Sequence, residues 1–510
     1  MASFQRYNMH KYWGKKPANG IVPLIERYSA PGDTLLDPFS GYGVFCMESY
    51  LRRRNVISND LNPFANYLTS VITDENVSID DVLDVWQRIE AELKPYVDEW
   101  YNISINNVEY SPISVLRNNN NVPIAFTYRD GRVTRKKDIP ADIADAFMSR
   151  EENTSITDWY PNTPLIANSR ISAVDGMTVP DLFTKRTLAC HSRLLSLINR
   201  YSTQSVKDLL LIAFTANLAN CSKLVPPIKS RGELAQGAWM TGFYIGETYI
   251  ENNVLHYYKN RLNKAIAGKK DFIATLHQSR LNSNIRPSIQ IINNDAKHLP
   301  LQNQSVDYVF TDPPYGDTVP YFEQSIIWNA WLNLVPDYLN EIVISDSNKR
   351  AKDIEDYSNG IAAAISEINR VLRPDRYFSI TYHSLSGHEW KAITNACLMN
   401  NFIVENFEWL EQATLPPRQL NRIKTIKGDV LVTFKKSGTA VPCNNIDEDD
   451  FRRQLNTIIL ACIKNGNNDT NSIMMSIMEW ILRSRVIIHD IDVFDYLNKT
   501  FNCNSEGKWQ

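Results

Sequence analysis

The chain has 510 residues, of which 43% are hydrophobic and 22% are charged, with a formal net charge of −3. This composition is typical of an ordinary folded protein and excludes a disordered or collagen-like chain. The small net charge neither favours nor excludes a nucleic-acid partner, because a local basic groove is enough to hold one.

Cysteine usage and hydropathy limit the cellular setting. The seven cysteines include no CxxC pair, which indicates neither a disulfide framework nor a zinc site, so we expect a reducing cytoplasm and no metal. The first residues, 1–7, lack the apolar run of a signal peptide. No run of about 18 apolar residues is present, so we expect no membrane span.

The first 75 residues follow the pattern of a doubly wound α/β domain. A helical pattern at 21–28 precedes a short apolar strand, Thr34–Asp37, and the glycine-containing loop 38–43 follows it. A second helical pattern, 44–53, leads to a second strand that ends on Asp60. A strand, a glycine loop, a helix and a strand ending in a carboxylate predict a nucleotide-binding half of such a fold.

Hydrophobic periodicity divides the rest of the chain into an insertion, a second α/β part and a C-terminal helical part. We expect an insertion at 76–288 that is mostly helical and contains a hairpin at 124–133 turning at Asp130-Gly131. The α/β pattern resumes over 289–436, with expected strands at 289–295, 305–311, 377–382, 402–410 and 429–434 and a helix at 359–372. A polar linker leads to a small helical domain at 449–510.

The glycine loop is the first candidate site. Gly41 and Gly43 allow the backbone to approach a ligand closely, and Asp60, about 20 residues on, could accept both hydroxyls of a ribose. A tight structural turn would explain the loop alone equally well. The loop together with Asp60 favours nucleotide binding.

The tetrapeptide Asp312-Pro313-Pro314-Tyr315 is the second candidate site, and it directly follows an apolar strand. Two prolines cannot continue a strand, so the chain must turn out at the carboxyl end of the sheet, where ligands bind in open α/β folds. Asp312 and the carbonyl of Pro313 could accept the two N–H groups of an exocyclic amine. Tyr315 could stack on a flipped-out base. A proline-rich turn with a chance aspartate is the structural alternative.

Together these motifs resemble the DNA amino-methyltransferase family, which methylates N6 of adenine or N4 of cytosine. The resemblance implies a Rossmann-like methyltransferase sheet, S-adenosyl-L-methionine as cofactor, and a target-recognition region in the gap at 76–288. The family's loop usually ends Gly-Ser-Gly, whereas Tyr42 holds the middle place here. The implied catalytic residues are Asp312, Pro313, Pro314 and Tyr315. The implied cofactor-binding residues are Lys11, Tyr12, Trp13, Asp37, Pro38, Phe39, Ser40, Gly41, Gly43, Asp60, Leu61, Asp295 and Ala296.

The implied reaction is direct methyl transfer to the N6 amino group of adenine in duplex DNA, with the base flipped out. No cysteine nucleophile is needed, and Pro442-Cys443 falls in the polar linker. N4-cytosine methylation, RNA amino- or guanine-methylation, and a non-catalytic nucleic-acid-binding module remain open. A cognate restriction or defence system as partner is also open.

Further residues near these motifs are weaker candidates. Asp317, Tyr321, Tyr382 and His383 could line a base pocket, although simple packing explains them as well. Basic residues in the insertion could contact phosphates, with a solvated surface charge as the alternative for each. They are Arg129, Arg132, Arg135, Lys136, Lys137, Lys185, Arg186, Arg231, Lys259, Arg261, Lys264, Lys269 and Lys270.

Overall fold

A computed structural model describes residues 4–232, 234–281, 283–382, 387–410, 429–488 and 491–510. The chain forms two compact units, each built from separate stretches of sequence. The sheet unit comprises residues 14–66, 279–319 and 337–510, and the helical unit comprises residues 1–13, 67–278 and 320–336.

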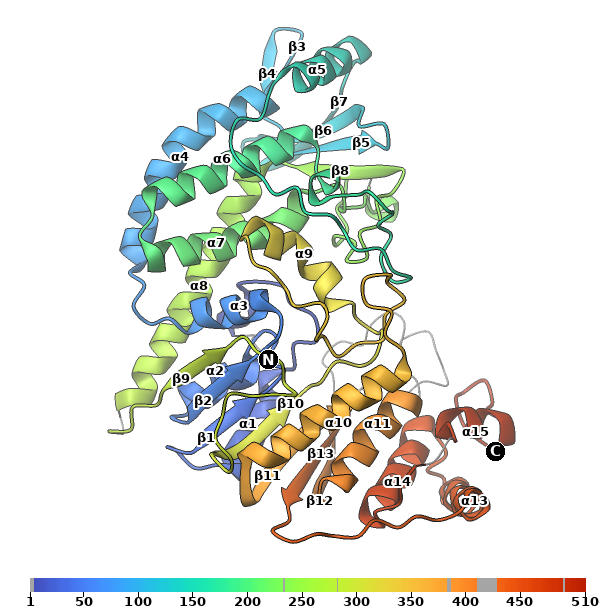
Figure 1. Cartoon of the computed structure of the whole chain (residues 1–510). Coiled ribbons are helices and arrows are strands. Elements are labelled where there is room, and N and C mark those ends of the chain that lie inside the picture. The colour runs from blue at the N-terminus through green and yellow to red at the C-terminus, as the bar shows by residue number, and fades with distance from the viewer. Residues whose placement is uncertain (1–3, 233, 282, 383–386, 411–428, 489–490) are drawn as a thin grey trace. The chain divides into compact units, whose positions relative to one another are not determined.

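A seven-stranded sheet organises the sheet unit, in the order β12-β13-β11-β10-β1-β2-β9 (Figure 1). Five neighbouring strands, β9, β2, β1, β10 and β11, pair in parallel, whereas β13 runs antiparallel to both β11 and β12. The strands are β1 (Thr34–Asp37), β2 (Asn55–Asn59), β9 (Ile289–Ile292), β10 (Val306–Thr311), β11 (Leu372–Tyr382), β12 (Phe402–Leu410) and β13 (Asp429–Lys436). The predicted strands therefore all form.

Helices cover both faces of this sheet, as a doubly wound fold requires. On one face, Phe45 of α2 (Val44–Leu51) stacks on Phe310, and Tyr28 of α1 (Ala18–Tyr28) lies against Tyr308. Alternate residues of β10 point to the other face, where Val309 packs in the core formed with α10 (Ile354–Val371) and α11 (Gly387–Met399). Figure 1 shows α10 and α11 in front of the strands.

Two helices of the sheet unit begin earlier than the apolar periodicity predicts. The predicted helix at 359–372 begins at Ile354, because Asp353 accepts hydrogen bonds from the amides of Glu355 and Asp356 and forms a capping box. The helix predicted from residue 21 begins at Ala18, directly after Pro17. The polar capping residue Asp353 carries no apolar signal, so the periodicity places the start of α10 too late. Helix α1 has no side-chain cap, and its first turn, Ala18-Asn19-Gly20, lacks the large apolar residues that mark the pattern from Ile21.

The C-terminal helices share one hydrophobic core with the sheet. They are α13 (Glu448–Lys464), α14 (Thr470–Arg483) and α15 (Val493–Thr500). Their apolar residues, such as Ile459 and Ile477, belong to the same buried cluster as Phe402 and Phe434 of the sheet. The predicted small helical domain at 449–510 is therefore part of the sheet unit, because its apolar face is buried against β12 and its neighbours.

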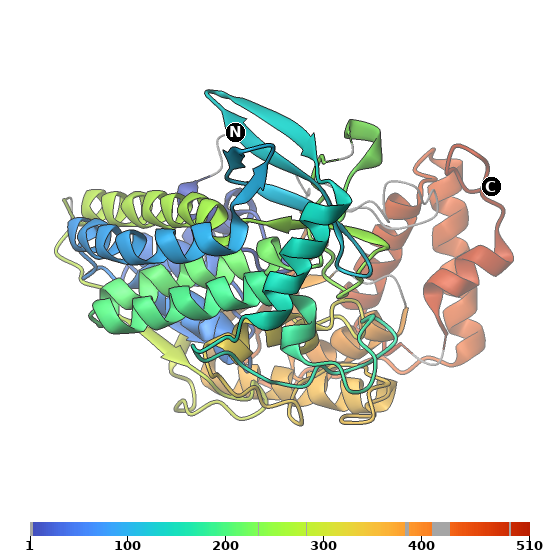
Figure 2. The same cartoon turned by 90° about the horizontal axis from the view of Figure 1, so that it is seen from above.

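The helical unit packs four long helices side by side: α4 (Ile79–Tyr101), α6 (Lys185–Tyr201), α7 (Gln204–Leu218) and α8 (Val254–Leu281) (Figures 1 and 2). It also contains an antiparallel sheet in the order β7-β6-β5-β8 and a hairpin of β3 (Ile103–Ile105) and β4 (Val108–Tyr110). The sheet strands are β5 (Ser114–Asn118), β6 (Pro123–Asp130), β7 (Val133–Asp138) and β8 (Thr248–Asn252). The shorter helices are α5 (Ala141–Asn153), α9 (Tyr321–Trp331) and α3 (Pro63–Thr73), of which residues 67–73 belong to this unit.

The predicted hairpin forms with its turn one residue later. Asp130 pairs with Val133, so Gly131 and Arg132 are the turn residues, and Gly131 adopts a φ of +59°. Glycine supplies this backbone conformation without steric cost, which explains the position of the turn.

Two cations predicted as candidate phosphate contacts are instead buried. Arg186 is fully buried and pairs with Glu251 at 2.6 Å, and its guanidinium lies over the ring of Phe147. Lys269 is also buried and donates to the carbonyls of Val71 and Ile72. Burial contradicts both alternatives considered for these residues, a phosphate contact and a solvated surface charge, because the two charges are satisfied inside the helical unit.

The boundaries of the predicted insertion also differ from the observed unit. Residues 1–13 and 320–336 belong to the helical unit, together with 67–278, whereas the sequence predicts only 76–288. The reason is aromatic packing: Trp13 stacks on Trp328 of α9 at 4.9 Å between ring centroids.

Every helix in the described part of the chain is too short or too polar to span a bilayer.

Candidate active site

The candidate site lies where the sheet changes its direction of winding. Strands β1 and β10 are parallel neighbours, with Leu35 opposite Tyr308. From β1 the sheet continues to β2 on one side, and from β10 it continues to β11 on the other. Ligands of open α/β sheets bind outside the carboxyl ends of strands at such a switch point. Asp37 ends β1 and Asp312 directly follows β10, so both predicted motifs lie at this edge.

The glycine loop folds back onto the end of β2. Gly41 and Gly43 have φ values of +51° and +78°, in the left-handed region that favours glycine. The amide of Ser40 donates to the carbonyl of Asn59 at 2.9 Å, and the Asn59 side-chain amide donates to the carbonyl of Pro38 at 3.0 Å. The loop is therefore held in one conformation beside the second strand.

Asp60 connects this loop to the residues after β2. Its Oδ2 accepts the Gly41 amide and its Oδ1 accepts the Asn62 amide, both at 2.8 Å. Each carboxylate oxygen has two lone pairs, so both oxygens can accept one further hydrogen bond. Burial raises the pKa of Asp60 to about 6, although the two amide donors oppose this shift.

Asp37 adds a second carboxyl group to the same place. Its Oδ1 accepts the amide of Phe39 at 3.1 Å, and its side chain is buried. Burial raises the pKa of Asp37 well above its ordinary value, and the nearby carboxylates of Asp312 and Asp60 raise it further. Because each negative charge here disfavours the next, a cation bound beside these carboxyl groups would favour their ionised forms.

The residues after β9 join the same edge. The Asn59 side-chain amide donates to the carbonyl of Asn294 at 3.0 Å, next to Asp295 and the buried Ala296. Asp295 itself accepts the amide of Lys297 at 2.9 Å and pairs with the Lys297 ammonium at 3.3 Å. The predicted cofactor residues after β1, β2 and β9 are thus brought together by Asn59.

Three neighbouring side chains hold the Asp312 carboxylate through one of its two oxygens. Its Oδ1 accepts the Tyr315 hydroxyl at 2.8 Å and the Thr381 hydroxyl at 2.6 Å, and it lies 3.1 Å from the Lys16 ammonium. Among the described residues, none donates to its Oδ2, and none donates to the carbonyl of Pro313. Two acceptors therefore remain available to a ligand.

Lys16 neutralises this part of the site. Its ammonium lies 2.8 Å from Oδ2 of Asp429, which is fully buried, and 3.1 Å from Asp312. Burial alone would lower the pKa of Lys16, but the two carboxylates outweigh it and raise the pKa. The sequence motifs did not identify Lys16, Thr381 or Asp429 as site residues.

Two tyrosine hydroxyls hold the tetrapeptide in place, that of its own Tyr315 and that of Tyr357. Tyr315 is 8% exposed, and its hydroxyl also lies 2.6 Å from the carbonyl of Thr381, so its single O–H proton is shared between this carbonyl and Asp312. The predicted stacking of Tyr315 on a base stays a prediction. The Tyr357 hydroxyl donates to the carbonyl of Pro314 at 2.8 Å, a role that no sequence motif indicated.

Three predicted cofactor residues belong to the helical unit. Tyr12 stacks on Tyr321 at 6.2 Å between ring centroids, and Trp13 stacks on Trp328. The ammonium of Lys11 lies 4.3 Å from the centroid of the Trp239 ring. Their contact with a cofactor stays a prediction. His383 lies outside the described residues.

Comparisons with known proteins return only distant similarities. No protein-family model and no curated protein sequence matches the chain. A SAM-dependent methyltransferase from Methanosarcina mazei matches 32% of this chain and 77% of its own, at 13% identity and a TM-score of 0.17. A methyltransferase solved with the Haloferax volcanii Trm112 methyltransferase activator matches 34% of this chain and 70% of its own, at 12% identity and a TM-score of 0.17. Similarity this low shows neither the family nor the function of the chain.

Proposed function

We propose that the protein is an S-adenosyl-L-methionine-dependent methyltransferase that modifies the N6 amino group of adenine in duplex DNA. One observation carries this proposal: the glycine loop after β1 and the Asp312–Tyr315 tetrapeptide meet at the carboxyl ends of two adjacent strands. A site for a nucleoside cofactor and a site for a planar amine therefore share one edge of the sheet.

The residues after β1 and β2 fit this cofactor. Asp60 has an accepting position left on each oxygen, which matches the two hydroxyls of a ribose. The cluster of Asp37, Asp60 and Asp312 suits a cationic sulfonium. The hydroxyl of Ser40 is buried and has no partner among the described residues, so it could bond to a ligand. When bound, the cofactor would supply an electrophilic methyl group.

The tetrapeptide fits an exocyclic amine. Asp312 Oδ2 and the Pro313 carbonyl are the two acceptors that no described residue uses, and an amino group has two N–H donors. Accepting both bonds would draw the nitrogen lone pair out of conjugation with the ring and make it a better nucleophile. The nitrogen loses one proton as it gains the methyl group, and the accepting Asp312 carboxylate is the group that would receive it.

Lys16, Thr381 and Tyr315 are positioning residues in this proposal. All three bond to Oδ1 of Asp312, which leaves Oδ2 directed to the substrate. Because the orientation is fixed before the substrate binds, little reorganisation is needed during the reaction. The adenine target and the DNA substrate rest on the resemblance of the motifs.

Incubation of the protein with duplex DNA and methyl-labelled cofactor, followed by nucleoside analysis, tests the proposal. We expect N6-methyladenine. The variant Asp312→Asn should lose transfer while still binding the cofactor. The control Asp375→Asn should keep both, because Asp375 is 75% exposed and its φ of +61° is one that asparagine also tolerates.

Each other outcome of this experiment contradicts a stated part of the proposal. N4-methylcytosine alone would contradict the adenine target. Methylation of tRNA or rRNA without methylation of duplex DNA would contradict the DNA substrate. Full transfer by Asp312→Asn would contradict the base-holding role of Asp312.

A further inference from the structure

A pocket of about 210 Å³ lies wholly inside the helical unit. It is formed by the N-terminal segment, the end of α7, the loop before β8, and helices α8 and α9. Three alanines line part of it, and the other lining residues are His10, Lys11, Asn220, Trp239, Arg261 and Trp328. Apart from Lys11, whose predicted contact with the cofactor is untested, no lining residue has a role in the proposed reaction.

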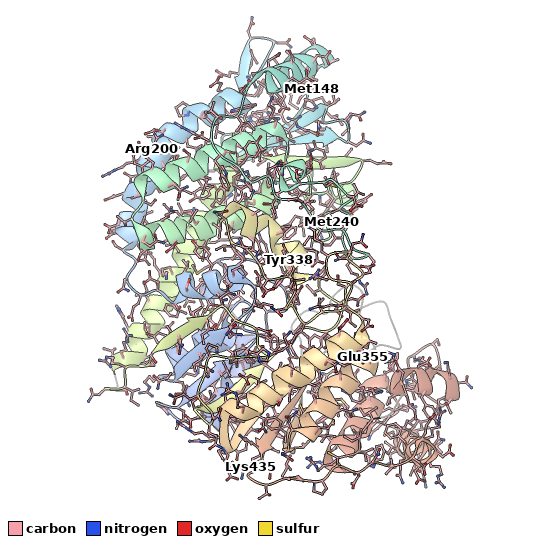
Figure 3. The ribbon with its side chains drawn as sticks, viewed as in Figure 1. Met148, Arg200, Met240, Tyr338, Glu355 and Lys435 are labelled. Carbon is pink, nitrogen blue, oxygen red and sulfur yellow. The ribbon has the colours of Figure 1, made fainter. Side chains whose placement is uncertain are left out.

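Its aromatic wall is tightly packed. Trp328 is 1% exposed and meets the His10 ring edge to face, with 4.9 Å between centroids. Trp239 meets Trp328 at 6.3 Å and an interplanar angle of 83°. Met240, which follows Trp239, is exposed and is labelled in Figure 3. The pocket is therefore bounded by rings that leave little freedom to collapse.

The wall carries two cations, Lys11 and Arg261, that form no ion pair with a carboxylate among the described residues. Lys11 is exposed, and its ammonium lies 4.3 Å from the centroid of the Trp239 ring. Arg261 is partly buried, and burial lowers its pKa, which means that its charged form is incompletely compensated. An anion in the pocket would supply the missing charge.

Capping of helix α7 does not account for these two cations. Cations near a helix C-terminus can satisfy its last carbonyls, and α7 ends at this pocket. However, the Asn220 side-chain amide already donates to the carbonyl of Ala216 at 2.6 Å, and the Ser222 hydroxyl donates to that of Ala219 at 2.9 Å. The helix end therefore does not need Lys11 or Arg261.

We propose that this pocket binds one phosphate group, held by the Arg261 guanidinium and the Lys11 ammonium with the Asn220 amide as a further donor. Sites for drug-sized ligands span about 300–1,000 Å³, so a volume of about 210 Å³ suits a phosphate and its adjoining sugar rather than a whole nucleoside cofactor. The phosphate belongs either to the DNA backbone, which rests on the proposed function, or to a free nucleotide.

The variant Arg261→Gln tests the pocket, and Lys270→Gln is its matched control. Lys270 is exposed on the same helix, nine residues on, and therefore on the opposite face. Binding of a fluorescent DNA duplex by the full chain is measured by anisotropy between about 50 and 200 mM salt. We expect Arg261→Gln to bind more weakly, with a log–log salt slope shallower by about 0.9, whereas Arg261→Lys keeps most of the affinity. Lys270→Gln should match the wild type.

Titration with inorganic phosphate and with dAMP, followed by calorimetry, distinguishes the two sources. Loss of phosphate and dAMP binding in Arg261→Gln, with unchanged DNA binding, would support the pocket with a free nucleotide as its ligand. Unchanged binding of all three probes would overturn the proposal. So would an equal loss of DNA affinity in Arg261→Gln and Lys270→Gln, because general surface charge would then explain both.

Thermal unfolding of each variant checks that it folds. If Arg261→Gln does not fold, Lys11→Gln provides a second variant for the phosphate titration. These readouts measure binding without any methyl transfer. A wild-type protein that binds phosphate through Arg261 but methylates no DNA would keep the pocket and refute the proposed function. A protein that methylates DNA, but binds none of the probes through Arg261, would refute the phosphate pocket and keep the proposed function.

Discussion

The ion pair of Lys16 with Asp312 and Asp429 supports a quantitative prediction for Lys16→Met. Methionine has nearly the length of lysine and no charge, so it removes the ammonium while keeping most of the packing. Lys16 is 10% exposed, Asp429 is fully buried and Asp312 is 17% exposed. The substitution therefore leaves two carboxylates without their shared cation.

Removing one partner of a buried ion pair costs about 3–5 kcal/mol. Asp312 is partly exposed, so water compensates some of the loss and the lower end of this range applies. A loss of about 3 kcal/mol lowers the melting temperature by about 6–12 °C for a unit of this size. Methyl transfer should also fall, because Asp312 loses one of the three groups that orient its Oδ1.

Thermal unfolding followed by circular dichroism measures the loss of stability, and a labelled-methyl assay measures transfer. Lys435→Met is the matched control on strand β13. Lys435 pairs with the exposed Asp375 and with no other carboxylate of the described residues, and it lies at the surface of the sheet unit (Figure 3). This control should leave both readouts unchanged. The double variant Lys16→Met, Asp429→Asn should recover most of the stability, because a neutral amide replaces the fully buried carboxylate and the charge left unpaired, on Asp312, is partly exposed. It should not recover the transfer. A melting temperature for Lys16→Met equal to that of the wild type would refute the reasoning.

Two further predictions concern the edges of the site. The pKa of about 6 for Asp60 means that this carboxylate is ionised above pH 6 and protonated below it, so cofactor affinity measured by calorimetry should fall as the pH drops through about 6. Asp60→Asn should remove that step, and an unchanged step would show that another group titrates. Gly316→Ala should lower the free energy of unfolding by about 1–3 kcal/mol, measured by thermal unfolding, because φ at this position is +55° and the new Cβ would lie 2.5 Å from Oε1 of Glu389. Gly438→Ala, where a Cβ meets nothing within 4 Å, should be neutral, and equal effects of the two substitutions would contradict this reasoning.

Much of the sheet and the two motifs of the candidate site follow from local sequence. Each parallel strand is a short apolar run bounded by turn residues, so its position can be predicted without knowing its neighbours. The glycine loop, Asp60 and the tetrapeptide are adjacent to such strands. Because parallel strands present their carboxyl ends at one edge, their meeting at that edge also follows from the pattern.

Local sequence did not predict the helix starts, the buried cations or the composition of the helical unit. Arg186 looks like a surface charge in the sequence, and only the fold brings Glu251 within 2.6 Å of it. Residues 1–13 and 320–336 join the helical unit through Trp13 and Trp328, which are far apart in the chain. Local periodicity contains no information about such long-range contacts.

The sequence by itself determined the two halves of the site, the loop with Asp60 and the Asp312–Tyr315 tetrapeptide, because each is a short motif tied to one strand. Only the tertiary structure decided what fixes Asp312. Strand β13 runs antiparallel to β11, with Tyr382 opposite Val430, so Asp429 at its beginning lies at the carboxyl end of β11. That register brings Asp429 to Lys16, 413 residues away in the chain, and a pairing across this distance is set by the sheet rather than by any local pattern.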